Sequence, residues 1–132
     1  MYLYDHSVQS ISVNSFIGRA HHAEWDSGQV GYVYTSHADI EKEYGAVTDE
    51  ALVKAENVVI AEVNLYDNYI RGECYGYKLY EGDEEIDSCW GFIGTFHEVI
   101  ENLKSELPKG AVELLDGMEY GETAEEYEES IA

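Results

Sequence analysis

The segment between Thr48 and Gly72 constrains the fold more than any other part of this sequence. Apolar residues recur in it at steps of three and four, and Thr48 is a common type of helix N-cap. Asp49 and Glu50 stand where negative charge favours the helix dipole, and Gly72 stands where such a helix ends. The pattern therefore predicts one amphipathic helix of about six turns. The predicted apolar stripe comprises Leu52, Ala55, Val59, Val63, Tyr66 and Ile70. Glu62 falls near this stripe, and nothing in the sequence explains a carboxylate there.

Shorter elements are expected before this helix. Residues 2–16 form two short segments split around Asp5-His6-Ser7, and polar and apolar side chains alternate in the second of them. This pattern predicts a hairpin or two short strands. Residues 17–29 have little periodicity and predict a loop, whereas 30–36, "VGYVYTS", are rich in Val and Tyr and predict a strand. Ser36 is placed to cap a short helix over 37–45.

A hairpin and a further helix are expected after the long helix. The runs "CYGYKLY" and "EIDSCWGF" predict paired strands, with "EGDE" as the turn between them. Thr95 and Glu98 match a capping box before an apolar helical face. This order favours an α+β fold, a mostly antiparallel sheet with about three helices packed on one face. We expect a single domain over 1–115 and an acidic, flexible tail over 116–132.

Charge is the dominant compositional feature of the chain. It has 28 Asp and Glu against 7 Lys and Arg, a formal net charge of -21. Three explanations for this negative charge are open: a strongly basic partner, a high-salt cytoplasm, or a merely well-solvated acidic surface. The same charge argues against direct binding to nucleic acid or to an anionic membrane. With no signal peptide and no apolar run long enough for a membrane span, the expected location is the cytoplasm.

Sequence motifs for catalysis or metal binding are missing. No ligand spacing typical of zinc, no G-x-S-x-G and no phosphate-binding glycine loop is found. We therefore predict no enzyme, no cofactor and no metal. An alternative is a small metal-dependent enzyme, or a protein that sequesters a small molecule, built around His6, Asp26 and Ser27. The stretch "WDSG" is more readily a turn that anchors Trp25, in which Asp26 and Ser27 bond the local backbone. Cys74 and Cys89 fit a reducing compartment, and a disulfide between them is left open.

Clustered carboxylates are the strongest candidates for a binding site. Five acids fall within seven residues at the predicted hairpin tip, and more line one edge of the long helix. Such rows of negative charge can compete with nucleic acid for a groove lined by Lys and Arg. The predicted partner is a basic nucleic-acid-binding protein of the host, and a homodimer is left open. The predicted contacts are Glu81, Asp83, Glu84, Glu85 and Asp87 on the hairpin, and Asp49, Glu56 and Asp67 on the helix.

Several motifs in fixed order support one family resemblance. "LYDHS", "WDSGQVGYVYTS", "KEYG", "YDNYIRGECYGY" and "EIDSCWGF" together resemble a family of small proteins carried by bacteriophages and prophages, mainly of Gram-positive bacteria. The resemblance covers roughly residues 2–105; the insert "IGRAHHAE" and the acidic tail depart from it. It implies an accessory gene of a mobile element, where small acidic proteins often counter host defence. It carries over no catalytic residue. The chain is thus expected to be an anti-CRISPR or anti-restriction inhibitor that mimics DNA.

Overall fold

The computed structural model describes residues 1–118 of the chain and has the predicted α+β class, with antiparallel sheets and helices. The chain divides into two compact units, the first over Met1–Arg71 and the second from Gly72 onward. Whether residues 1–115 act as one domain stays a prediction. Most of the predicted acidic tail, 119–132, lies outside the described residues. Among residues 1–118, no helix combines the length and apolar character that crossing a membrane requires.

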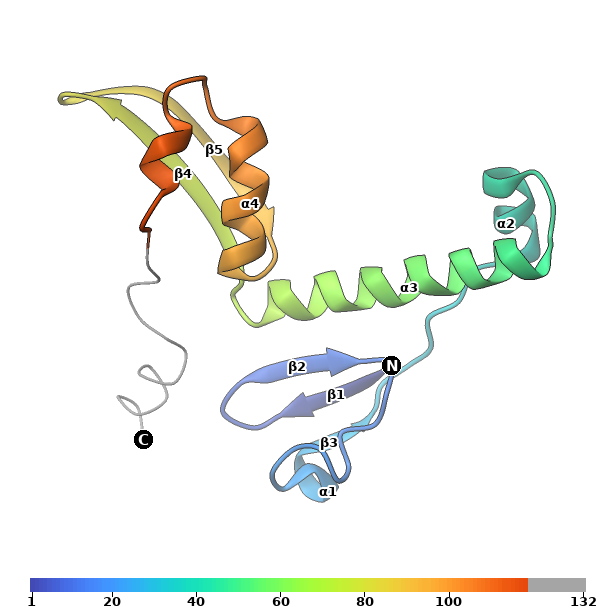
Figure 1. The fold of residues 1–132 in the computed structure, drawn as a ribbon. Helices are drawn as coiled ribbons and strands as arrows, with labels where there is room; N and C mark the ends of the chain where they lie inside the picture. The colour runs from blue at the N-terminus through green and yellow to red at the C-terminus, as the bar shows by residue number, and fades with distance from the viewer. Residues whose placement is uncertain (119–132) are drawn as a thin grey trace. The chain divides into compact units, whose positions relative to one another are not determined.

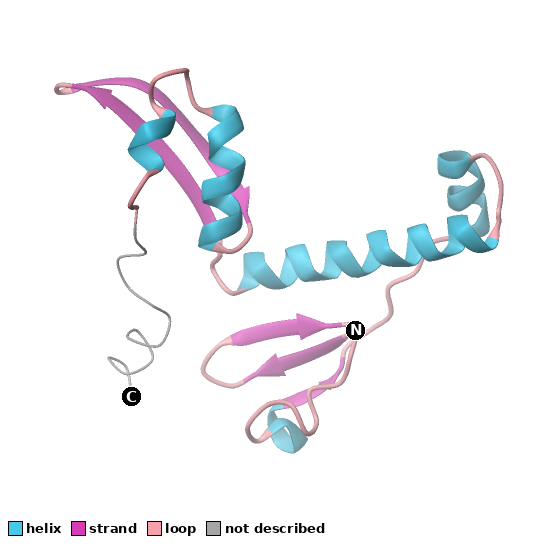
Figure 2. Ribbon diagram, in the orientation of Figure 1, coloured by secondary structure: helices cyan, strands magenta, loops and turns pink. Residues whose placement is uncertain are grey.

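The first unit contains a three-stranded antiparallel sheet in the order β2-β1-β3 (Figures 1 and 2). The central strand pairs Leu3 with Ile11 on one side and with Gly28 on the other. The first two strands confirm the hairpin predicted near the start. The elements are β1 Tyr2–Asp5, β2 Gln9–Ser12, the single-turn helix α1 Ala23–Asp26 and β3 Ser27–Gln29.

Two helices complete the first unit, and both begin at the predicted residues. Helix α2, His37–Tyr44, is capped by the Ser36 side chain, and helix α3, Asp49–Ile70, by the Thr48 side chain. Helix α2 lies against the start of α3, while α3 also packs against β2. A small core cluster joins α2 to α3 and consists of Ile40, Ala51 and Ala55. Of the predicted stripe, Ala55 and Val63 are buried, whereas Leu52 and Tyr66 are exposed.

The region between β2 and α2 differs from its prediction. Residues 17–29 are not simply a loop, because they include α1 and β3. The ladder ends at Gln29, so residues 30–36 form no strand, although they were predicted to form one. Trp25 is not anchored either, since 87% of its surface is exposed. A high content of Val and Tyr favours extended backbone, but it cannot show whether a neighbouring strand is there to pair with it.

The second unit is a long hairpin covered on one face by a helix (Figure 2). Its elements are β4 Cys74–Glu81, β5 Glu84–Ile93, α4 Phe96–Glu106 and the 3-10 helix η1 Val112–Leu115. The predicted hairpin and the predicted capping box of Thr95 and Glu98 are both confirmed. A core cluster of buried side chains consists of Val99, Leu103 and Leu115, and Tyr75, Tyr77 and Phe92 pack against it.

The other face of the hairpin carries Trp90. It lies opposite Gly76 in the ladder, and a Cβ at position 76 would overlap the Trp90 ring. The ring therefore covers the glycine, yet 69% of Trp90 is exposed. Cys74 and Cys89 are both free, and their partners across the ladder are Ile93 and Tyr77.

Candidate functional site

The tip of the β4–β5 hairpin presents three exposed carboxylates on a tight turn. Glu81 and Glu84 are paired directly across the ladder, and only Gly82 and Asp83 separate them. Gly82 has φ +63°, a conformation that suits a glycine at the first central position of a two-residue hairpin turn. No described residue forms a hydrogen bond or ion pair with the side chains of Glu81, Asp83 or Glu84. Like charges directly opposite one another destabilise a hairpin, so this tip is electrostatically costly.

The remaining two acids of the hairpin are held by internal partners. Lys78 Nζ donates to Glu85 at 2.9 Å, and the Tyr80 hydroxyl donates to the same carboxylate at 3.3 Å. The hydrogen bond from Lys78, with help from Ser88, lowers the pKa of Glu85 below its usual value. Asp87 accepts a hydrogen bond of 2.7 Å from the Tyr77 hydroxyl. The hairpin acids therefore fall into three free groups at the tip and two that brace the strands.

The Tyr77–Asp87 contact should be measurable by titration. The hydrogen bond to Asp87, partial burial and the Asp87 charge raise the pKa of Tyr77 from 10.0 to about 12. Asp87→Asn is expected to lower this pKa from about 12 toward its ordinary value, because a neutral amide oxygen accepts a weaker hydrogen bond than a carboxylate and the charge beside the phenol is removed. The readout is the ¹³Cζ chemical shift of Tyr77 followed against pH.

The matched control removes one tip charge without touching Tyr77. Glu84→Gln should leave the pKa of Tyr77 near 12. Because the folded-state pKa is raised, the contact stabilises the second unit fully below pH 10, and this contribution is lost as pH rises toward 12. A Tyr77 that ionises at its ordinary pH in the unchanged chain would contradict the contact.

The predicted acids of the long helix lie in different surroundings. Asp49 and Glu56 are exposed. Asp67 is instead only 18% exposed, and its Oδ1 accepts hydrogen bonds from the Ser10 hydroxyl and the Ile11 N–H, each 2.7 Å long. Asp67 thus ties α3 to β2, a long-range role that helical periodicity does not reveal.

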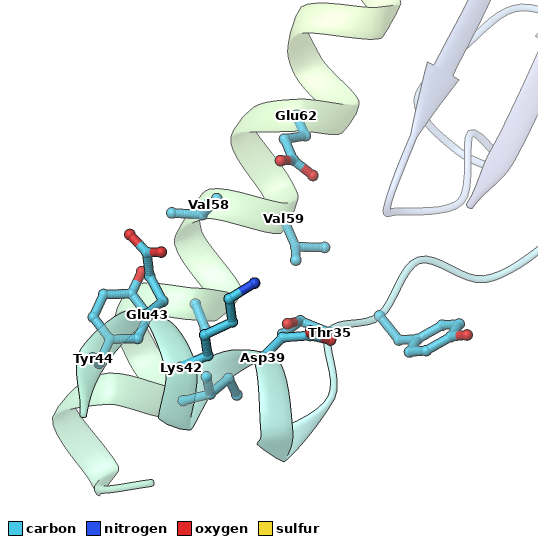
Figure 3. A pocket seen from close by; sticks show the side chains of 11 residues that line it. Thr35, Asp39, Lys42, Glu43, Tyr44, Val58, Val59 and Glu62 are labelled. Atoms are coloured by element: carbon cyan, nitrogen blue, oxygen red, sulfur yellow. The ribbon is translucent and has the colours of Figure 1, made fainter. Parts of the chain in front are cut away.

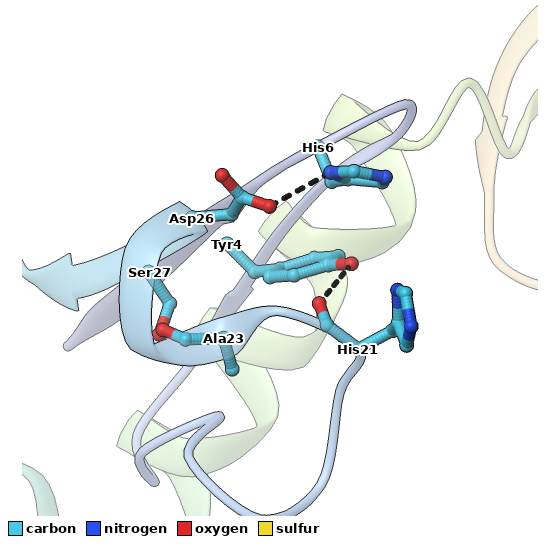
Figure 4. A network of polar contacts seen from close by, with 6 residues as sticks. All are labelled: Tyr4, His6, His21, Ala23, Asp26 and Ser27. Atoms are coloured by element: carbon cyan, nitrogen blue, oxygen red, sulfur yellow. Dashed lines mark hydrogen bonds and ion pairs between the residues drawn. The ribbon is translucent and has the colours of Figure 1, made fainter.

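The residues of the alternative site come from three segments of the first unit (Figure 4): His6 follows β1, Asp26 ends α1 and Ser27 begins β3. His6 Nδ1 and Asp26 Oδ2 are 2.8 Å apart. The Ser27 hydroxyl donates to the Ala23 carbonyl at 2.6 Å, as expected for a local backbone bond. The Ser27 hydroxyl forms no hydrogen bond with His6. Within residues 1–118, no three His, Cys, Asp or Glu side chains are placed to share a metal ion.

A groove between α2 and α3 was not predicted (Figure 3). It has a volume of about 400 Å³, with apolar side chains at its base and carboxylates from both helices around them. Glu62, whose place near the apolar stripe the sequence did not explain, lines this groove. Its position was the one sign of the groove in the sequence. The lining residues are Tyr34, Thr35, Asp39, Ile40, Lys42, Glu43, Tyr44, Ala55, Val58, Val59 and Glu62.

Comparison with known proteins adds no identity to this geometry. No protein-family model, no curated protein and no solved structure matches the chain.

Proposed function

We propose that the chain is a phage-type anti-defence inhibitor, of the anti-CRISPR or anti-restriction kind. Its acidic surface mimics nucleic acid and occupies the basic groove of a host nuclease in the cytoplasm. The observation that carries the proposal is the hairpin tip, where Glu81, Asp83 and Glu84 are exposed and without a described partner. The resemblance to phage proteins supplies the biological context.

The physical argument rests on unfavourable charge that a partner can neutralise. A net charge of -21 opposes folding through self-repulsion, and the opposed Glu81 and Glu84 add to that cost. On binding, a groove lined by Lys and Arg would reduce both the overall self-repulsion of the chain and the local repulsion between Glu81 and Glu84. Duplex DNA presents about one charge per 1.7 Å of its axis, and a protein with dense surface carboxylates offers a comparable field. Such a field also accelerates association, and salt weakens it.

A plating experiment tests the function directly. Bacterial strains that each carry one defined system, a restriction enzyme or a CRISPR effector nuclease, are infected with a phage that the system cuts. Expression of the chain is expected to restore plating in the strain that holds its target and to leave plating without any system unchanged. The nuclease identified in this way is then purified, and DNA cleavage is measured with and without the chain at two salt concentrations.

Two outcomes would count against the proposal. Failure to protect phage in any strain of a broad panel would argue against an anti-defence role. Inhibition that is insensitive both to salt and to excess competitor DNA would argue against nucleic-acid mimicry, because a mimic competes for the same basic groove.

The His6–Asp26 contact favours a second candidate function. A carboxylate bonded to one imidazole nitrogen orients the other nitrogen, as in the outer shell of many metal sites. A small metal-dependent enzyme, or a protein that sequesters a small molecule, would use His6, Asp26 and Ser27. Stoichiometric zinc or manganese in the purified chain, lost on His6→Ala, would favour this candidate over the inhibitor.

A further inference from the structure

The groove between α2 and α3 combines an apolar base with an acidic rim. Ile40 and Ala55 are buried at its base, and Val58 and Val59 extend it along α3. Three carboxylates line it from both helices, namely Asp39, Glu43 and Glu62, against one cation, Lys42.

The charges of this groove are largely uncompensated. Asp39 accepts a hydrogen bond of 2.5 Å from the Ser36 hydroxyl as part of the helix cap. Glu43 and Glu62 have no hydrogen bond or ion pair with a described residue, and neither has Lys42. In Figure 3, Lys42 and Glu43 extend from α2, and Glu62 extends from α3. The excess of carboxylates selects a cationic ligand, and the apolar base selects one with an aliphatic stem.

The segment beside the groove has the features of a strand without a neighbour. Tyr32 and Tyr34 are exposed, at 81% and 84%, while Val33 and Thr35 between and after them are half-buried. This two-residue alternation is that of a strand. From Tyr32 to Thr35, no backbone N–H or C=O is hydrogen-bonded to any described residue. A strand-like segment with free backbone groups is a template for another chain.

The two features are continuous, because Tyr34 and Thr35 belong to both. A peptide that paired with the backbone of Tyr32–Thr35 would have a side chain at the mouth of the groove. Arginine fits best. Its stem can pack on Val58 and Val59, its planar head can stack on a tyrosine ring, and its fork of donors matches carboxylates.

We propose that the groove and the Tyr32–Thr35 segment bind an extended, arginine-bearing segment of a protein partner. The peptide adds a strand along Tyr32–Thr35 and places the arginine between Glu43 and Glu62. A second copy of this chain is a poor occupant, since each copy carries a net charge of -21. The site lies in the first unit, away in sequence from the hairpin, and it does not depend on the proposed nuclease inhibition.

Titration of the isotope-labelled full chain with a defined peptide, acetyl-TVRVT-amide, tests this site by NMR. The amide signals of Tyr32–Thr35 and the methyl signals of Val58 and Val59 are expected to shift together with one dissociation constant. Replacing the arginine of the peptide by citrulline, which keeps its shape and removes its charge, should weaken binding about 10-fold. Methylating the peptide backbone nitrogens should weaken it further, because strand pairing is blocked.

Protein variants separate the groove from general acidity. Glu43→Gln with Glu62→Gln should weaken peptide binding about 10-fold. The control, Glu24→Gln with Glu41→Gln, makes the same charge change outside the groove and should alter binding less than about 2-fold. Equal weakening by both pairs would overturn the proposal.

Three further results would also overturn it. One is the absence of shifts at millimolar peptide. Another is the same set of shifts with spermidine but not with the peptide, which would indicate a small-cation site. The last is a concentration-dependent shift of these signals in the chain alone, which would indicate self-association.

Discussion

Replacing Glu81, Asp83 and Glu84 together with lysine is expected to reduce affinity for the nuclease target by at least about 100-fold. The three carboxylates have no described partner, so their loss breaks no internal contact. In the complex, each would face a cation of the target, and each reversal converts an attraction into a repulsion. The variant should therefore also lose its protection of phage in the plating assay.

The matched control carries the same change in net charge elsewhere. The control replaces Glu24, Glu41 and Glu106 by lysine; all three are exposed and lie outside the β4–β5 hairpin in the sequence. If affinity depended only on total charge, both triple variants would weaken binding equally. The expected result is a large loss for the tip variant and a small one for the control, with both retaining the circular dichroism spectrum of the unchanged chain. Unchanged affinity of the tip variant would exclude the hairpin as the contact.

Asp67→Ala is expected to lower the free energy of unfolding by about 2 to 3 kcal/mol. The carboxylate is mostly enclosed and accepts two hydrogen bonds of 2.7 Å, one from the Ser10 hydroxyl and one from the Ile11 N–H. Removing it leaves these two donors without their acceptor at the contact of β2 with α3. Urea unfolding measures the loss, and hydrogen exchange of the Ile11 amide locates it.

Two companion variants separate the causes. Glu56→Ala removes an exposed carboxylate of the same helix and should change stability by less than about 0.5 kcal/mol. Ser10→Ala removes one of the two donors and should cost less than Asp67→Ala, because the Ile11 bond survives. An Asp67 variant as stable as the Glu56 variant would contradict the structural role. Loss of target binding in an Asp67 variant is informative only when its fold is shown to be intact.

The parts of the fold that could be predicted are those set by local chemistry. Thr48, Ser36 and Thr95 each cap a helix through bonds within four residues, so their sequence context was sufficient. The hairpin turn at Gly82 is equally local. The prediction that failed concerns the pairing of strands that lie far apart in the sequence. Residues 30–36 have strand-like composition, but composition cannot show that Tyr2, the first residue of β1, lies opposite Gln29, so that the ladder does not extend along 30–36.

The candidate site divides in the same way. The density of acids at the tip was visible in the sequence, and the turn then fixes Glu81 opposite Glu84. The partners of Glu85 depend on an irregular register after Leu79, which brings Tyr80 opposite it. Asp67 was placed on an exposed edge because helical periodicity contains no information about β2. The acidic groove was missed because its two helices and its adjoining segment come together only in three dimensions.

The exposure of Trp25 and Trp90 gives each compact unit its own optical reporter. The chain has two tryptophans, one before and one after the boundary at Gly72. Both are largely exposed in the chain itself, so their emission is that of an indole in water. Trp90 lies on the strand that leads from the acidic tip, whereas Trp25 lies in α1. In a Trp25→Phe chain, tryptophan fluorescence would thus come from the second unit alone. In a Trp90→Phe chain it would come from the first unit alone, without any attached dye.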